Sequence, residues 1–238
     1  MSKTTIVKKN LKNSTYLTLK EKLINCIYPP GTILNEIQLA EDFGLSRTPV
    51  REAISRLEMD GYVKVMPKKG IYVTDISLND VHQIFQTRIE IEPIALKLAA
   101  PYLETDELIM FRNRFEHDTP DIINAFRLDT AMHLFIIEHC GNRYIIDMMR
   151  KLFDDNTRIV IASKQNQVRI HNAKCEHLEI LDSLIAREDL EKTAALMGAH
   201  LETCRRAALD YFYSLEYSHS IPEKAQYIQE LSKLSQQS

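Results

Sequence analysis

Residues 39–61 read LAEDFGLSRTPVREAISRLEMDG, and this stretch decides the fold of the N-terminal part of the chain. Gly44 ends one short helical pattern, and Ser46 and Pro49 suit the cap and first turn of the next. The apolar face of this second helix consists of Val50, Ala53, Ile54 and Leu57. Two short helices joined by a tight turn are typical of a helix-turn-helix.

The flanking sequence completes a winged helix-turn-helix. After a polar N-terminal arm, apolar residues recur at helical spacing over 16–27, and Asn35 suits the cap of the following helix. Downstream, residues 62–66 and 71–74 alternate as two short strands around a turn at 67–70. Three helices followed by a hairpin wing predict a DNA-binding head.

The exposed side of the third predicted helix carries candidate DNA contacts. Arg47 and Arg51 lie off the apolar face, and a guanidinium can donate two hydrogen bonds to O6 and N7 of guanine. Ser46 and Thr48 lie at the helix start, where free N–H groups also suit phosphate oxygens. On the wing, the predicted contacts are Lys68, Lys69 and Gly70. Spacing alone leaves open that the two arginines are only a solvated face.

Several sequence segments of this region together resemble the DNA-binding domain of the GntR family. The resemblance is carried by residues 39–54, by LEMDGYV at 57–63, by PGTIL at 30–34 with Glu36, and by PKKGIYV at 67–73. It implies a homodimer that reads a short inverted repeat in double-stranded DNA.

Charge and helical pattern divide the chain near residue 75. Residues 1–75 hold 12 Lys and Arg against 8 Asp and Glu, whereas the remaining 163 residues hold 18 against 25. A basic segment joined to an acidic one indicates two domains, the first suited to a polyanion. Only helical patterns follow residue 78, with Pro93 predicting a kink or break in the first of them. We expect a mainly α protein: a winged helix-turn-helix over 1–75, an all-helical ligand-binding and dimerisation domain over 76–215, and an extra helix or tail over 216–238.

Several classes of protein are disfavoured by composition. No apolar run approaches the roughly 18 residues of a membrane span, and the lysine-rich N-terminus is not followed by the apolar stretch of a secretory signal. The four cysteines form no CxxC pair, so neither a disulfide framework nor a cysteine zinc knuckle is indicated. We expect a cytoplasmic protein with no membrane partner.

A set of ionisable residues falls on apolar helix faces in the second half of the chain. Asp129 and His133 are four apart and share one face, and His177 and His200 lie on the apolar faces of two later segments. Such groups are costly to bury unpaired, and a divalent metal would satisfy all four together. The alternative is that Asp129 and His133 form an i,i+4 ion pair, while His177 and His200 are core histidines satisfied by hydrogen bonds.

Residues 78 to about 213 resemble the FCD ligand-binding domain of the FadR subfamily of GntR regulators. The matching pieces are RIEIE at 88–92, DTAMH at 129–133, GN at 141–142, EH at 176–177 and HL at 200–201. The resemblance implies that Asp129, His133, His177 and His200 bind a divalent transition metal, with zinc or nickel the expected ion.

Arg88 is charged yet lies on the apolar stripe of its segment. It is either the partner of Glu92 in a structural ion pair or, as the resemblance implies, the group that grips a small organic acid, since a guanidinium offers a carboxylate two parallel donors. We therefore expect a ligand-responsive transcription regulator, a repressor released from its operator by a carboxylate effector. A metal sensor and, with less support, a metal-dependent hydrolase or lyase are the alternatives, although no Ser/His/Asp or Cys/His arrangement suggests an enzyme.

Overall fold

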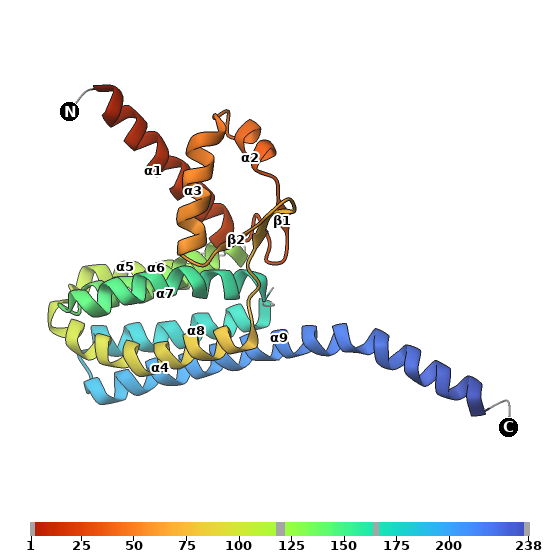
Figure 1. Ribbon diagram of the computed structural model, residues 1–238. Coiled ribbons are helices and arrows are strands. Elements are labelled where there is room, and N and C mark those ends of the chain that lie inside the picture. The colour runs from red at the N-terminus through yellow and green to blue at the C-terminus, as the bar shows by residue number, and fades with distance from the viewer. Residues whose placement is uncertain (1–2, 118–121, 164–166, 236–238) are drawn as a thin grey trace. The chain divides into compact units, whose positions relative to one another are not determined.

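The computed structural model describes residues 3–117, 122–163 and 167–235 (Figure 1). The chain divides into two compact units. The first comprises the residues up to Ile76 together with Lys151–Ala162, and the second comprises Ser77–Arg150 and the residues from Ser163 onward. The first break thus falls close to residue 75, while residues 151–162, which the sequence assigned to the helical domain, group with the first unit.

The first unit contains the winged helix-turn-helix. Its elements in chain order are α1 (Lys3–Ile24), β1 (Ile33–Leu34), α2 (Glu36–Asp42), α3 (Arg47–Met59), β2 (Val63–Met66) and β3 (Gly70–Val73). Its core is built from side chains of all three helices and of the wing, among them Leu19, Leu23, Leu39, Val50, Leu57 and Val73. The helix α1 begins at Lys3, so the expected polar arm is helical.

Local signals in the sequence place α2 and α3. The Asn35 side chain caps α2 by accepting from the N–H of Ile37 at 2.8 Å, as predicted. Gly44 has φ +61°, a conformation that glycine adopts without strain, and it ends the turn before α3. The predicted inward face of α3 is confirmed by four buried residues: Val50, Ala53, Ile54 and Leu57.

Within the described residues, the wing is part of a three-stranded antiparallel sheet in the order β1-β3-β2. The sequence predicted only β2 and β3, because β1 has two residues and no alternation of its own. Gly70 begins β3 with φ +119°, and a Cβ at this position would lie 2.7 Å from the carbonyl oxygen of Leu34. Glycine therefore permits the close approach of β1 to the wing turn.

The second unit is built from helices, which confirms the mainly α fold. The elements are α4 (Leu78–Ala99), the 3₁₀ turn η1 (Ala100–Tyr102), α5 (Thr105–His117), α6 (Ile122–Glu138), α7 (Arg143–Ala162, whose second half belongs to the first unit), α8 (Gln167–Ile185) and α9 (Leu190–Ser235). Helix α4 packs against α9 and α6, and α8 packs against α5 and α9 (Figure 1). Ser77 and Asp80 form a capping box at the start of α4.

Two expectations for the helices are corrected. Helix α4 continues through Pro93 without the predicted break, while the predicted kink stays a prediction, and α9 and α6 pack along this helix. The extra C-terminal helix is not separate, because α9 runs unbroken through Pro222 to Ser235, and residues 236–238 of the expected tail lie outside the described residues. Over the described part of the chain, no helix combines the length and the apolar character that crossing a membrane requires.

The steric role of Gly70 can be tested by comparing Gly70→Ala with Gly61→Ala. Both glycines have positive φ, so each alanine carries a backbone strain of about 1–3 kcal/mol. Only at Gly70 does the added methyl group also meet a backbone oxygen, whereas nothing lies within 4 Å at Gly61. We expect Gly70→Ala to lower the urea midpoint, followed by circular dichroism, more than Gly61→Ala does. Equal losses would contradict the proposed contact with β1.

Candidate functional site

The exposed arginines of α3 are held by one carboxylate. The Nε of Arg47 donates to Oε1 of Glu36 at 2.9 Å, and the Nε of Arg51 donates to the same oxygen at 2.8 Å. Burial would raise the pKa of Glu36, but the hydrogen bonds from Arg51 and Arg47 outweigh it and lower that pKa. Both arginine side chains stay more than half exposed, so their terminal nitrogens can reach a base edge. The sequence did not reveal this role of Glu36, which depends on the angle between α2 and α3.

The start of α3 and the wing carry the other predicted DNA contacts. Ser46 and Thr48 are exposed, and in the described chain the Ser46 hydroxyl makes no capping bond with α3, which leaves it open to a phosphate oxygen. Lys68 and Lys69 are exposed at the wing turn. Gly70 has the structural role described above, and its contact with DNA stays a prediction.

The structure brings together the four predicted metal ligands. Asp129 and His133 lie on α6, His177 lies on α8 and His200 lies on α9. One ligand atom of each residue lies within 4.8 Å of all the others. The three histidines are buried, with exposed fractions of 1% or less, and Asp129 is partly buried. The core of the second unit therefore contains a compact donor set of three imidazoles and one carboxylate.

Two distances within this cluster match those between ligands of one ion, and a third is somewhat longer. Ligand atoms that each lie about 2.1 Å from an ion, at angles of about 90–110°, are about 3.0–3.4 Å apart. The Nε2 of His177 lies 3.0 Å from Oδ1 of Asp129 and 3.2 Å from Nε2 of His200. The Nε2 of His133 lies 3.8 Å from the same Asp129 oxygen. Neutral imidazole nitrogens with a carboxylate suit zinc, nickel and related divalent ions.

Two further carboxylates, those of Glu92 and Glu176, orient two of the three histidines, and neither role was predicted from the sequence. Oε2 of Glu92 lies 2.5 Å from Nδ1 of His133, and Oε2 of Glu176 lies 2.7 Å from Nδ1 of His200. A carboxylate at Nδ1 holds the proton there and leaves the lone pair on Nε2, the tautomer that a metal needs. Both glutamates lie in the sequence segments that resemble the FCD domain. Glu176 directly precedes the predicted ligand His177, and Glu92 is four residues after Arg88.

The electrostatics of the cluster favour a cation. Burial and the neighbouring His200 lower the pKa of His177 to about 3, so this ring is neutral. Burial also opposes the charged form of His200, but Cys204 and Glu176 outweigh it and raise its pKa to about 10. Burial would raise the pKa of Asp129, yet the hydrogen bond from His177 and the nearby imidazoles lower it well below its ordinary range. A proton or a metal ion is therefore favoured between these groups.

Arg88 is a partner of Glu92 in the structure. Its Nε donates to Oε1 of Glu92 at 2.5 Å, and the two side chains are 2% and 1% exposed. The buried ion pair that the sequence left as an alternative is thus present. Glu92 uses its other oxygen for His133, so α4 connects Arg88 to the cluster through one carboxylate. The role of Arg88 in effector binding stays a prediction.

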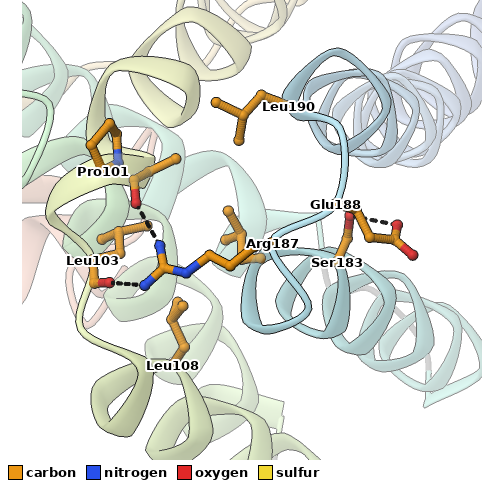
Figure 2. A pocket seen from close by; sticks show the side chains of 9 residues that line it. Pro101, Leu103, Leu108, Ser183, Arg187, Glu188 and Leu190 are labelled. Carbon is orange, nitrogen blue, oxygen red and sulfur yellow. Dashed lines mark hydrogen bonds between the residues drawn. The ribbon is translucent and has the colours of Figure 1, made fainter.

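A separate hollow of about 250 Å³ lies where η1 and the start of α5 meet the turn between α8 and α9 (Figure 2). Its lining contains Arg187, which donates to the carbonyl oxygens of Ala100 at 2.9 Å and Leu103 at 3.1 Å. These bonds satisfy the carbonyl groups that follow α4. Arg187 therefore acts as a structural clamp, and none of the metal-ligand candidates lines this hollow.

Two family models match the chain. The model of "Bacterial regulatory proteins, gntR family" matches residues 11–73, and the FCD domain matches residues 83–203. The first range includes all the predicted DNA contacts, and the second includes Arg88 and the four residues of the metal-ligand cluster.

Known proteins similar to the chain are regulators of transcription. An uncharacterized HTH-type transcriptional regulator in an unstable DNA locus of Streptomyces ambofaciens is 38% identical over 195 residues, which are 80% of this chain and 81% of that protein. The uncharacterized HTH-type transcriptional regulator YdhC of Bacillus subtilis (strain 168) is 30% identical over 145 residues, which are 58% of this chain and 65% of YdhC. The solved structure of E. coli McbR/YncC has a TM-score of 0.71 at 22% identity and covers 85% of this chain and 98% of its own, which shows a shared fold. The two relatives found by sequence are named as transcriptional regulators, in agreement with the expectation that the chain is not an enzyme.

The orientation of α3 predicts distinct effects of its arginines and of the wing lysines. Arg47→Ala and Arg51→Ala should each weaken binding to an operator selected from random DNA by about 1–3 kcal/mol, with little change for unrelated DNA. Lys69→Ala is the matched control: it should weaken both DNAs alike and lower the salt dependence by about one charge. Fluorescence anisotropy at several salt concentrations measures both effects. Unchanged operator affinity in both arginine variants would contradict the proposed reading face.

Proposed function

Because the chain belongs to the gntR family of bacterial regulatory proteins and carries an FCD domain, we propose that it is a ligand-responsive transcriptional repressor of the FadR subfamily. In this proposal, residues 1–75 bind DNA, residues 76–215 bind a metal, an effector and a second subunit, and the C-terminal segment 216–238 contains the end of the last helix, which runs to Ser235. The protein acts in the cytoplasm, where its operator is. The observation that carries the effector part is the buried cluster of Asp129, His133, His177 and His200 beside Arg88.

The proposed DNA-bound form is a homodimer on an inverted repeat. One subunit offers one α3 to one half-site, and a two-fold related pair of subunits matches the symmetry of an inverted repeat. Exposed apolar side chains on α4 and η1 support a protein contact in the second unit: Ile94 is 47% exposed, Leu98 is 44% exposed and Tyr102 is 66% exposed.

The proposed ligand of the second unit is a small organic acid bound to a divalent ion. The four protein donors would hold zinc or nickel, and the ion would supply a Lewis-acidic position for a ligand oxygen. Arg88 would hold the carboxylate of the same ligand with its planar guanidinium. Since Glu92 already binds Arg88, the ligand would have to share this arginine with Glu92 or replace that carboxylate.

A metal sensor is the second candidate, because the same cluster could respond to the ion alone. The two functions differ in what releases the DNA: an acid at constant metal, or the metal without an acid. Both share the metal site and the DNA-binding head.

The metal site predicts stabilisation by zinc. Protein purified without an affinity tag and stripped with chelator should gain thermal stability when zinc is added, by about 2.7 kcal/mol at a free concentration of 100 times Kd. His177→Ala should abolish the gain, whereas His82→Ala, at an exposed position outside the cluster, should keep it. Differential scanning calorimetry measures the shift. A wild-type protein that neither contains nor responds to metal would show that the cluster is structural.

The same experiment has a pH dependence of known sign. The pKa of His200 is raised to about 10, so the metal-free imidazole keeps its proton at neutral pH and the ion must displace it. Zinc affinity should therefore rise with pH through the neutral range, with release of a proton on binding. Calorimetric titration in buffers of different ionisation enthalpy measures that release.

The effector proposal predicts that a carboxylate weakens operator binding. Zinc-loaded protein bound to its selected operator should be released by one or more members of a panel of lactate, malate and citrate. Arg88→Lys should lose this response, because an ammonium lacks the two-pronged geometry, while it preserves a positive charge beside Glu92. Anisotropy of labelled operator gives the readout. Release by zinc alone, with no effect of any acid, would favour the metal sensor.

A further inference from the structure

One thiol lies beside the metal-ligand cluster. Cys204 is one helical turn after His200 on α9, so the two side chains share a face. Its Sγ lies 3.5 Å from Nε2 of His200, the same nitrogen that faces Nε2 of His177 at 3.2 Å. Cys204 lies one residue beyond the matched FCD range, which ends at residue 203.

This separation has the size expected for two ligands of one ion. With an ion–nitrogen bond of about 2.05 Å, an ion–sulfur bond of about 2.3 Å and an angle of about 100–110°, the two donor atoms are about 3.3–3.6 Å apart. The observed 3.5 Å between Sγ of Cys204 and Nε2 of His200 falls in this range. Two edges of the cluster, 3.0 and 3.2 Å, meet the corresponding criterion for an ion bound by nitrogen and oxygen.

The contact between the thiol and the imidazole has to change when an ion binds. Nδ1 of His200 is engaged by Glu176, so Nε2 is the nitrogen of this ring that would bind an ion once the ion has displaced its proton. When that nitrogen binds the ion, its present contact with Sγ of Cys204 is lost. The sulfur, which lies 3.5 Å from this nitrogen, would then be within reach of the ion.

We propose that Cys204 is a fifth protein ligand, so that the donor set of the site is three histidines, one aspartate and one thiolate. The inference rests on the metal site of the proposed function. Its chemical consequence is selectivity: a soft thiolate favours zinc, cobalt, cadmium and related thiophilic ions over manganese and magnesium, which prefer oxygen ligands.

Cobalt(II) is the probe that tests the inference. In metal-free full-length protein kept reduced, bound cobalt gives visible d–d bands, and a thiolate ligand adds a sulfur-to-cobalt charge-transfer band in the near ultraviolet. We expect both signals in the wild type. Cys204→Ser should lose the charge-transfer band and keep the d–d bands. Cys175→Ser, which alters an exposed thiol two residues before His177, is the matched control and should keep both.

The outcomes separate the two levels of the proposal. Visible bands without charge transfer in the wild type would leave the metal site intact and overturn the role of Cys204. A charge-transfer band that persists in Cys204→Ser would assign the thiolate to another cysteine and overturn it equally. The absence of both signals would instead refute the metal site. Zinc X-ray absorption gives an independent check that does not depend on cobalt, since a sulfur neighbour at about 2.3 Å is distinct from nitrogen or oxygen at about 2.0–2.2 Å.

Discussion

The convergence of three imidazole nitrogens on one point constrains the second unit more than any other interaction. Each ring is buried, and the Nε2 atoms of His177 and His200 face each other at 3.2 Å. Two nitrogen lone pairs at this distance repel unless a proton or a metal ion lies between them. Because the three histidines come from α6, α8 and α9, a cation at that point connects three helices that are distant in sequence. The packing of these helices and the chemistry of the site therefore depend on each other.

Glutamates set the geometry of arginines in both units, but under different energetic conditions. Glu36 binds Arg47 and Arg51 through their Nε atoms at an exposed surface, where ion pairs contribute little to stability and serve mainly to orient the side chains. Glu92 binds Arg88 in the same way in the core, where loss of either partner would leave a buried charge. The first pair can open when DNA competes for the guanidinium groups. The second can change only if another anion takes the place of Glu92.

The sequence predicted the elements that depend on local signals. The Asn35 cap and the inward face of α3 follow from residues a few positions apart, and so does the shared face of Asp129 and His133. What it did not predict depends on contacts between distant segments. The short strand β1 pairs with β3 at a close approach that a Cβ at Gly70 would obstruct, and α4 continues through Pro93 while packing on two other helices. Helical periodicity also predicted that His177 and His200 lie on inward faces, but the distance between their rings depends on the packing of α8 on α9.

The chemistry of an effector follows from the energy of the Arg88 pair. Breaking a buried ion pair by removing one partner costs about 3–5 kcal/mol, while allosteric coupling is typically about 1–3 kcal/mol. A ligand that merely separated Arg88 from Glu92 would therefore cost more free energy than the allosteric coupling it could produce. A ligand that brings its own carboxylate to Arg88 avoids that cost, and a second oxygen on the ion can compensate for the loss of its hydration. Glu92 also holds His133, and only the four residues 74–77 separate the end of β3 from the start of α4 at Leu78. In the proposed function, an exchange of carboxylates at Arg88 would thus act on the helix that directly follows the wing, and a small acid with a second coordinating oxygen would be the effector best suited to this site.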